Sequence, residues 1–174
     1  MKSLIIYTSQ TGFTKRYATW LHEEIGGEIL ELKSAKKQKK DYFASFDTII
    51  FGGWAKASSV VNAKWFFKKS KSWHDKKLIL FCVGASPMDN PDIVQFKEAV
   101  IPKEDKTFIK FFYCSGGLNY AKMGWSSKLL LKMFTTMLKR SKDEKNRKIA
   151  EMLSHSYDIS NKKYLDPIIE QLNK

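Results

Sequence analysis

The chain has 174 residues, with 31 Lys and Arg against 18 Asp and Glu, and its formal net charge is +13. This length predicts a single domain over residues 1–174, whose core is large enough to need no disulfide or metal. Hydrophobic residues make up 43% of the chain, which excludes global disorder. The positive charge indicates an anionic partner, such as a lipid surface, a nucleic acid or an acidic small molecule.

Neither a membrane span nor a metal site is expected. The longest apolar run, residues 78–85, is too short to cross a bilayer. The apolar stretch at the N-terminus is too short for a signal peptide, so we expect a cytoplasmic protein. Cys82 and Cys114 lie too far apart in sequence for a zinc motif, and the three histidines have no ligand-like spacing.

Short apolar runs alternate with helical patterns along most of the chain. Strands are predicted at residues 3–8, 28–32, 46–51, 77–83 and 107–114, and helices near 17–25, 60–69, 93–100 and 161–172. The lysine-rich residues 33–40 are predicted to be a solvated loop. This alternation predicts an α/β fold with a five-stranded parallel sheet, doubly wound by helices, that binds ligands at the carboxyl ends of its strands.

About forty residues between the fifth strand and the last helix exceed what such a sheet needs. We place an insert at about 117–155, within which residues 129–139 form an amphipathic helix with an apolar arc of about 200°. From Lys122 to Lys148 there are nine basic residues and two acids. Two alternatives stay open, because the helix could bury its apolar arc against the sheet or could lie on an anionic membrane.

The loop after the first strand is the candidate ligand site. It opens a helix, whose free N–H groups and dipole favour an anion, and its hydroxyls and glycine suit a phosphate. A plain Ser/Thr helix cap is the alternative interpretation. The loop consists of Ser9, Gln10, Thr11, Gly12, Phe13 and Thr14.

The run Ser9-x-Thr11-Gly12-x-Thr14 resembles the FMN-phosphate loop of flavodoxins. The resemblance implies a 2-1-3-4-5 sheet that holds FMN at its carboxyl edge, with the loops after strands three and four around the flavin ring. Flavodoxins usually stack an aromatic residue from the second of these loops on the flavin, and residues 84–91 contain none, so Trp54 is the candidate. The two loops comprise Gly53, Trp54, Ala55, Lys56 and Ala57, and Val83, Gly84, Ala85, Ser86, Pro87 and Met88.

The insert, with Gly116-Gly117-Leu118-Asn119-Tyr120, Trp125 and the basic helix, is similar to that of the menaquinone-dependent protoporphyrinogen oxidases. This resemblance implies an FMN-dependent oxidoreductase that passes electrons from a porphyrinogen to a quinone at the inner face of the membrane. No catalytic side chain is predicted, because the flavin carries the chemistry. A soluble flavodoxin-like electron-transfer protein is the first alternative. The second is a flavin-free basic adaptor on membrane or nucleic acid, although no nucleic-acid partner is expected.

Overall fold

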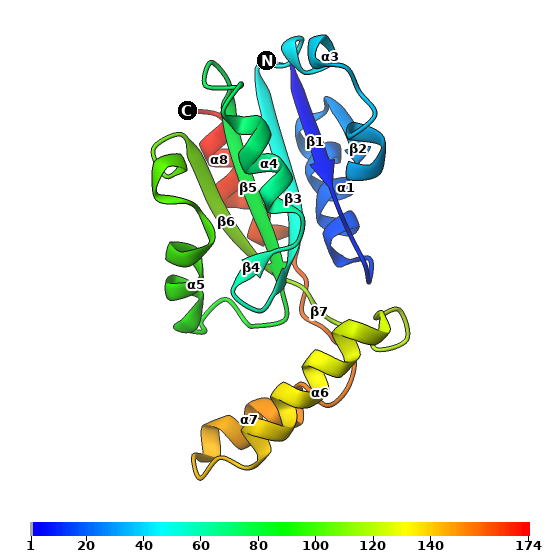
Figure 1. The fold of residues 1–174 in the computed structure, drawn as a ribbon, viewed down its shortest axis with the longest axis vertical. Coiled ribbons are helices and arrows are strands. Elements are labelled where there is room, and N and C mark those ends of the chain that lie inside the picture. The colour runs from blue at the N-terminus through cyan, green and yellow to red at the C-terminus, as the bar shows by residue number, and fades with distance from the viewer. Residues whose placement is uncertain (1) are drawn as a thin grey trace.

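The computed structural model describes residues 2–174, so that of the predicted range 1–174 only Met1 lies outside it. A parallel sheet in the order β2-β1-β3-β5-β6 forms the centre of the molecule (Figure 1). When the parallel strands alone are counted, this order is 2-1-3-4-5, and the predicted doubly wound, flavodoxin-like sheet is confirmed. The strands are β1 (Ser3–Tyr7), β2 (Glu28–Glu31), β3 (Thr48–Lys56), β5 (Lys77–Gly84) and β6 (Ile109–Ser115).

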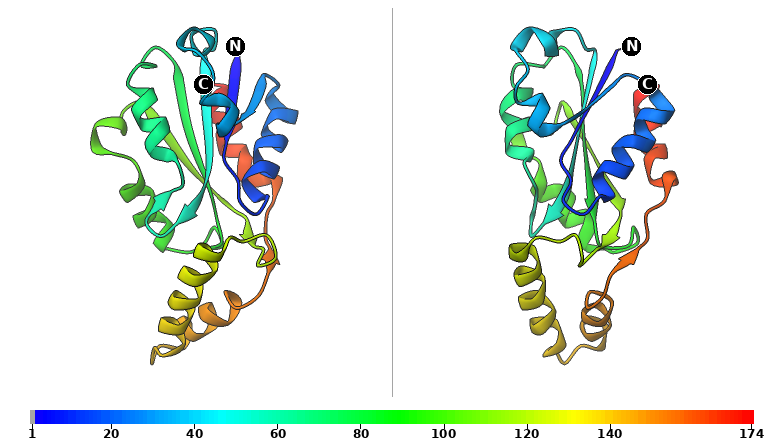
Figure 2. Two further views of the ribbon diagram at one scale, coloured as in Figure 1. Left: turned by 45° about the vertical axis from the view of Figure 1, so that its right-hand side comes forward. Right: turned by 90° about the vertical axis from the view of Figure 1, so that its right-hand side faces the viewer.

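Helices cover both faces of the sheet, as Figure 2 shows. Because side chains alternate along a strand, Leu4 and Ile6 of β1 pack on one face and Ile5 on the other. The first face is covered by α4 (Ala63–Ser70) and α5 (Asp92–Val100), and the second by α1 (Phe13–Ile25) and α8 (Asp166–Leu172). The 3-10 helix η1 (Lys103–Asp105) precedes β6. These two cores, one on each face, pack the helices against the sheet.

Two sequence predictions about local structure need correction. The predicted solvated loop 33–40 begins inside the short helix α2 (Leu32–Ala35), whose Leu32 and Ala35 are buried. Residues 36–40 are exposed as predicted, and the short helix α3 (Lys40–Ala44) begins at the end of this range. The predicted loop 53–57 is largely strand: β3 continues to Lys56 and turns back into the antiparallel strand β4 (Ser59–Val60).

The insert forms a separate helical hairpin. The chain leaves β6 through β7 (Gly117–Leu118), forms α6 (Trp125–Lys139) and α7 (Glu144–Met152), and returns through β8 (Tyr157–Asp158) and η2 (Lys162–Leu165). In Figures 1 and 2 the hairpin protrudes beyond the carboxyl edge of the sheet. It has a small core of its own, formed by Leu118, Leu138, Ala150 and Leu153. The alternative in which α6 buries its apolar arc against the sheet is therefore wrong.

The base of the hairpin is a tight antiparallel pair, in which Gly117 faces Asp158 and Leu118 faces Tyr157. Gly117 has a φ of +146°, and a Cβ atom there would lie 2.1 Å from the Tyr157 carbonyl oxygen. Only glycine fits this position, so the close approach of β7 and β8 depends on it.

Candidate functional site

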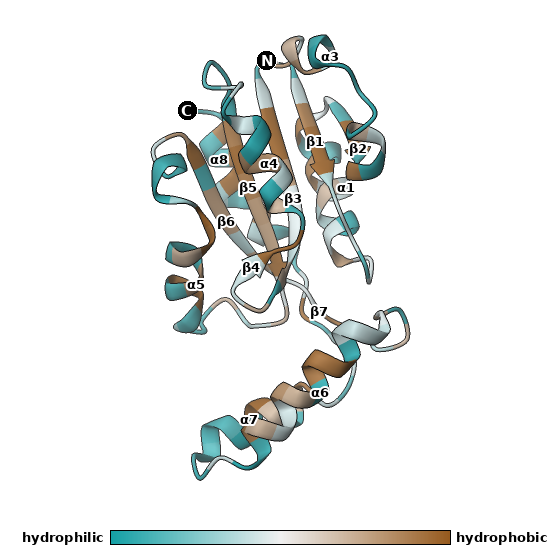
Figure 3. Cartoon of the chain, in the orientation of Figure 1, coloured by the Kyte–Doolittle hydropathy of each residue, from teal (hydrophilic) through white to brown (hydrophobic). Residues whose placement is uncertain are grey.

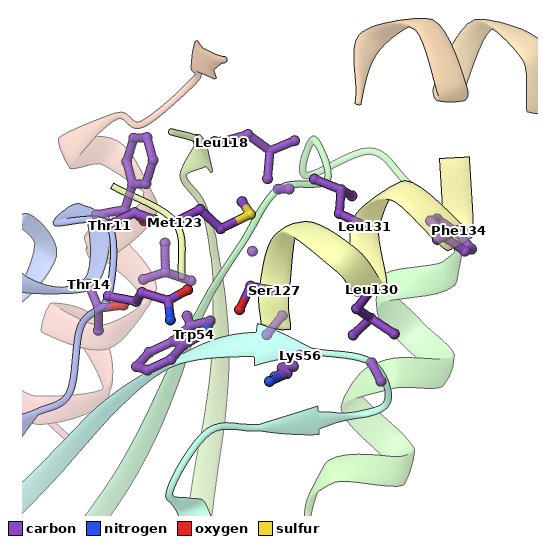
Figure 4. Close-up of a pocket in the computed structure, with 18 residues that line it drawn as sticks. Thr11, Thr14, Trp54, Lys56, Leu118, Met123, Ser127, Leu130, Leu131 and Phe134 are labelled. Carbon is purple, nitrogen blue, oxygen red and sulfur yellow. The ribbon is translucent and has the colours of Figure 1, made fainter. Parts of the chain in front are cut away.

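A cavity of about 530 Å³ lies where the hairpin meets the carboxyl edge of the sheet. Figure 4 shows Thr11 and Thr14 at one end and Leu130 and Phe134 of α6 at the other. Its volume falls within the range of about 300–1,000 Å³ that is usual for small-molecule and cofactor sites. The predicted site residues that line it are Gln10, Thr11, Phe13, Thr14, Trp54, Ala55, Lys56, Ala57, Val83, Gly84 and Ala85.

The first end of the cavity is the start of α1. Within residues 2–174 no side chain caps this helix, whose first-turn N–H groups follow a loop containing Ser9, Thr11 and Thr14. Gly12 has a φ of +102°, a left-handed conformation that favours glycine, and its N–H donates to Ser9 Oγ at 3.2 Å. An uncapped helix start beside hydroxyl groups fits a phosphate.

The end of β3 and the turn after it form another wall. Trp54, Ala55 and Lys56 line the cavity from the strand, and Ala57 lines it from the turn, with a φ of 51°. Among the described residues, Lys56 is the one charged side chain in the lining. This wall therefore offers an aromatic surface beside a single positive charge.

Six of the predicted site residues lie outside the cavity lining: Ser9, Gly12, Gly53, Ser86, Pro87 and Met88. Ser9 and Gly12 instead shape the loop after β1, through the hydrogen bond between them, and other residues of this loop line the cavity. Met88 is 43% exposed. Whether any of the predicted residues contacts FMN stays a prediction.

The insert supplies lining residues that the sequence interpretation did not assign to the site: Gly117, Leu118, Met123, Ser127, Leu130, Leu131 and Phe134. The apolar arc of α6 was visible in the sequence. Its periodicity indicates that a face is apolar, but it does not indicate what that face contacts.

The apolar arc of α6 divides into three parts. Leu131 and Leu138 pack in the hairpin core, while Leu130 and Phe134 face the cavity together with Leu131. The third part, which we call the outer ridge, comprises Trp125, Leu129, Met133 and Met137 at four-residue spacing. It is exposed, with 81% of Trp125 and 64% of Met133 accessible. Figure 3 shows that several segments of α6 are coloured as hydrophobic.

An ion pair joins the return strand of the insert to the start of α1. Arg16 Nη1 donates to Asp158 Oδ2 at 2.5 Å and to Ser160 Oγ at 2.7 Å. Partial burial raises the pKa of the Asp158 carboxyl, but hydrogen bonds from Ser160 and Arg16 outweigh burial and hold the pKa below its usual value. The carboxylate thus holds β8 beside the helix that opens the cavity.

Within residues 2–174, no helix is long and apolar enough to span a bilayer. The same residues contain no group of three or more His, Cys, Asp or Glu side chains placed to hold a metal ion.

The sequence profile of the flavodoxin-domain family matches residues 4–145. The chain therefore belongs to the flavodoxin-domain family, which supports the FMN expected from the loop after β1. This chain is 33% identical over 122 residues to the flavodoxin-like domain-containing protein BilS of Clostridioides difficile (strain CD3). That match covers 67% of this chain and 66% of BilS, so the chain spans just under two thirds of its relative.

The structure is similar to solved flavoproteins at low identity. A flavoprotein from Lactobacillus acidophilus NCFM in complex with FMN is 17% identical, with a TM-score of 0.44 over 66% of this chain and 91% of that chain. A WrbA-like flavodoxin from Agrobacterium tumefaciens is also 17% identical, with a TM-score of 0.43 over 72% of this chain and 87% of that chain.

Proposed function

We propose that this chain is an FMN-dependent oxidoreductase whose cofactor occupies the cavity at the carboxyl edge of the sheet. The observation that carries the proposal is the uncapped start of α1, which opens with Thr11 and Thr14 onto a cavity walled by Trp54. The helix start would hold the phosphate, and the walls formed by β3 and β5 would hold the ring. FMN supplies electron transfer when bound, and the protein binds it, orients it and limits water around it.

The finer proposal is an activity of the protoporphyrinogen-oxidase type, with a porphyrinogen as the electron donor and a quinone as the acceptor. Three features support it. Leu130 and Phe134 add an apolar wall suited to a large apolar ring, and Lys56 offers a positive charge to a carboxylate. The basic hairpin would attract the same acidic substrate.

An absorbance spectrum and an activity assay test this proposal in order. The purified chain, incubated with FMN and desalted, should retain a flavin spectrum, and it should then oxidise protoporphyrinogen faster with a quinone analogue than without one. A chain that retains no flavin contradicts the whole proposal. A chain that binds FMN but turns over no porphyrinogen would instead be an electron-transfer protein.

We propose that the insert makes peripheral contact with the cytoplasmic face of an anionic membrane. The outer ridge of α6 is apolar and exposed, and Lys128, Lys132 and Lys139 lie beside it on the exposed surface of the same helix. Such a helix suits the boundary of an anionic bilayer, where each lysine contributes about 1 kcal/mol.

Sedimentation with vesicles containing anionic lipid tests the membrane contact. The variant Leu129→Ser/Met133→Ser should lose binding, and replacing the three lysines by Gln should weaken binding most at low salt. The matched control is Leu130→Ser/Phe134→Ser, which alters the cavity face of the same helix and should leave vesicle binding unchanged. Equal losses in both double variants would contradict a role for the outer ridge.

A further inference from the structure

Hydrogen bonds from the neighbouring strand hold the carbonyl groups at the end of β5 and in the loop that follows it. The Gly116 N–H donates to the Gly84 carbonyl at 2.7 Å. The Ser86 carbonyl accepts from Ser115 Oγ at 2.9 Å and from Tyr113 Oη at 3.1 Å. The Gly84 and Ser86 carbonyls are thus held by β6, the neighbouring strand in the sheet, and by Gly116 directly after it.

The Ala85 carbonyl, between Gly84 and Ser86 in the chain, accepts its hydrogen bond from the insert instead. Tyr157 Oη, from β8, donates to the Ala85 carbonyl at 2.7 Å. Ala85 also packs against the hairpin core, as Tyr157 does. Burial raises the pKa of the Tyr157 phenol to about 12, so it remains a protonated donor at neutral pH. Tyr157 therefore joins the hairpin to a loop whose residue Ala85 lines the cavity.

We propose that Tyr157 is a positioning residue of the cofactor site, which fixes the Ala85 peptide beside the flavin and thereby couples the flavin's redox potential to the hairpin. The inference rests on the proposed FMN site. Without the Tyr157 hydroxyl, the Ala85 carbonyl loses its hydrogen-bond donor. The Ala85 peptide is then free to rotate toward the cavity. A carbonyl oxygen near the ring disfavours the electron-rich reduced flavin, because the negative end of its dipole faces added negative charge.

The test compares two conservative variants of the hairpin. Tyr157→Phe removes the bond to Ala85. Tyr120→Phe is the matched control, because the Tyr120 hydroxyl donates to the Leu153 carbonyl, within the hairpin. Both tyrosines pack against the same small core outside the two sheet cores.

The first measurement is FMN affinity in the oxidised and the reduced state. We expect Tyr157→Phe to weaken binding of reduced FMN about tenfold relative to oxidised FMN, which makes the two-electron potential about 30 mV more negative. Tyr120→Phe should leave this ratio unchanged. An unchanged ratio in Tyr157→Phe, or an equal change in both variants, overturns the coupling.

The second measurement needs no flavin. In the FMN-free protein, amide hydrogen exchange over residues 84–88 should accelerate in Tyr157→Phe and not in Tyr120→Phe, because only the first variant frees the loop. Unchanged exchange overturns the positioning role. If the wild-type chain binds no FMN, the proposed function fails on its own, and the exchange comparison still decides whether Tyr157 holds the loop.

Discussion

Thr14 is the hydroxyl residue whose removal tests the phosphate end of the cavity. Its side chain is almost fully buried while lining the cavity, so it is fixed before any ligand arrives. Thr14→Ala should weaken FMN binding by about 1.5–3 kcal/mol, as for a hydrogen bond to a charged group. Titration of the flavin-free protein with FMN measures this loss.

The control for this prediction is Thr135→Ala. Thr135 is also a buried threonine, but its hydroxyl donates to the Lys132 carbonyl inside α6 at 3.0 Å. That variant should bind FMN as the wild type does. If a Thr11→Ala/Thr14→Ala double variant binds FMN with wild-type affinity, this loop is not part of the FMN site.

Trp54 gives a second prediction at the scale of single residues. It is half-buried and lines the cavity from β3, so a flavin ring in the cavity should quench its fluorescence. We expect addition of FMN to quench the wild type more than Trp54→Phe. Because the chain has five tryptophans, the difference between the two proteins is the quantity to measure. Identical quenching would make Trp54 a packing residue only.

The residues that line the cavity were predictable to different degrees. Hydroxyls and a glycine at a helix start form a sequence pattern that indicates a phosphate site, so Thr11 and Thr14 could be proposed from sequence. Leu130 and Phe134 carry no such pattern, because a leucine that faces a cavity and one that faces a helix look alike in a sequence. Their assignment needs the position of α6 relative to the sheet.

At the scale of elements, the Arg16–Asp158 pair predicts an acid-sensitive attachment of β8. The pKa of Asp158 is lowered in the folded chain, so ionisation of this carboxyl stabilises the fold above its unfolded pKa of about 3.9. That stabilisation is lost as the pH falls below about 4. Thermal melts between pH 3 and 5 should therefore show a smaller pH dependence for Asp158→Asn than for the wild type.

Asp75→Asn is the control for the acid melts, because Asp75 lies on the surface and, within residues 2–174, its one ion pair is with the adjacent Lys76. It should keep the wild-type pH dependence. If Asp158→Asn also keeps it, the pair with Arg16 contributes nothing to stability.

The hairpin as an element depends on a very small core. Leu138 is buried between α6 and α7, so Leu138→Ala should destabilise the hairpin by about 2 kcal/mol or more. Hydrogen exchange should accelerate across residues 125–152 while the sheet strands stay protected. Met133→Ala, on the outer ridge of the same helix, should leave exchange unchanged. Loss of protection in β3 and β5 would show that the hairpin and sheet unfold together.

Helices and strands rich in apolar residues were easier to predict from the sequence than short or highly charged ones. β5 was predicted almost to the residue because it is a continuous apolar run. α7 was not predicted, because Ile149, Ala150 and Met152 are its only apolar residues and the rest are charged or polar. The strands β7 and β8 have two residues each, too few for any periodicity to appear.

At the scale of the whole molecule, the cavity lies at the junction of two bodies with separate cores. The sheet supplies the loops after β1 and β5 and the end of β3, and the hairpin supplies the facing apolar wall. The two are tied by the Tyr157–Ala85 hydrogen bond and the Arg16–Asp158 ion pair. Any movement of the hairpin would therefore change the shape of the cavity.

The close pairing of β7 with β8 makes the hairpin an exchangeable module. The chain departs at Leu118 and comes back at Tyr157, directly opposite in the ladder, so everything between these two residues begins and ends at one place. A two-residue turn could bridge that gap without rerouting β6 or α8. The sheet could thus accept a different appendage at this position, with its own cofactor loops unchanged and a different wall over the cavity.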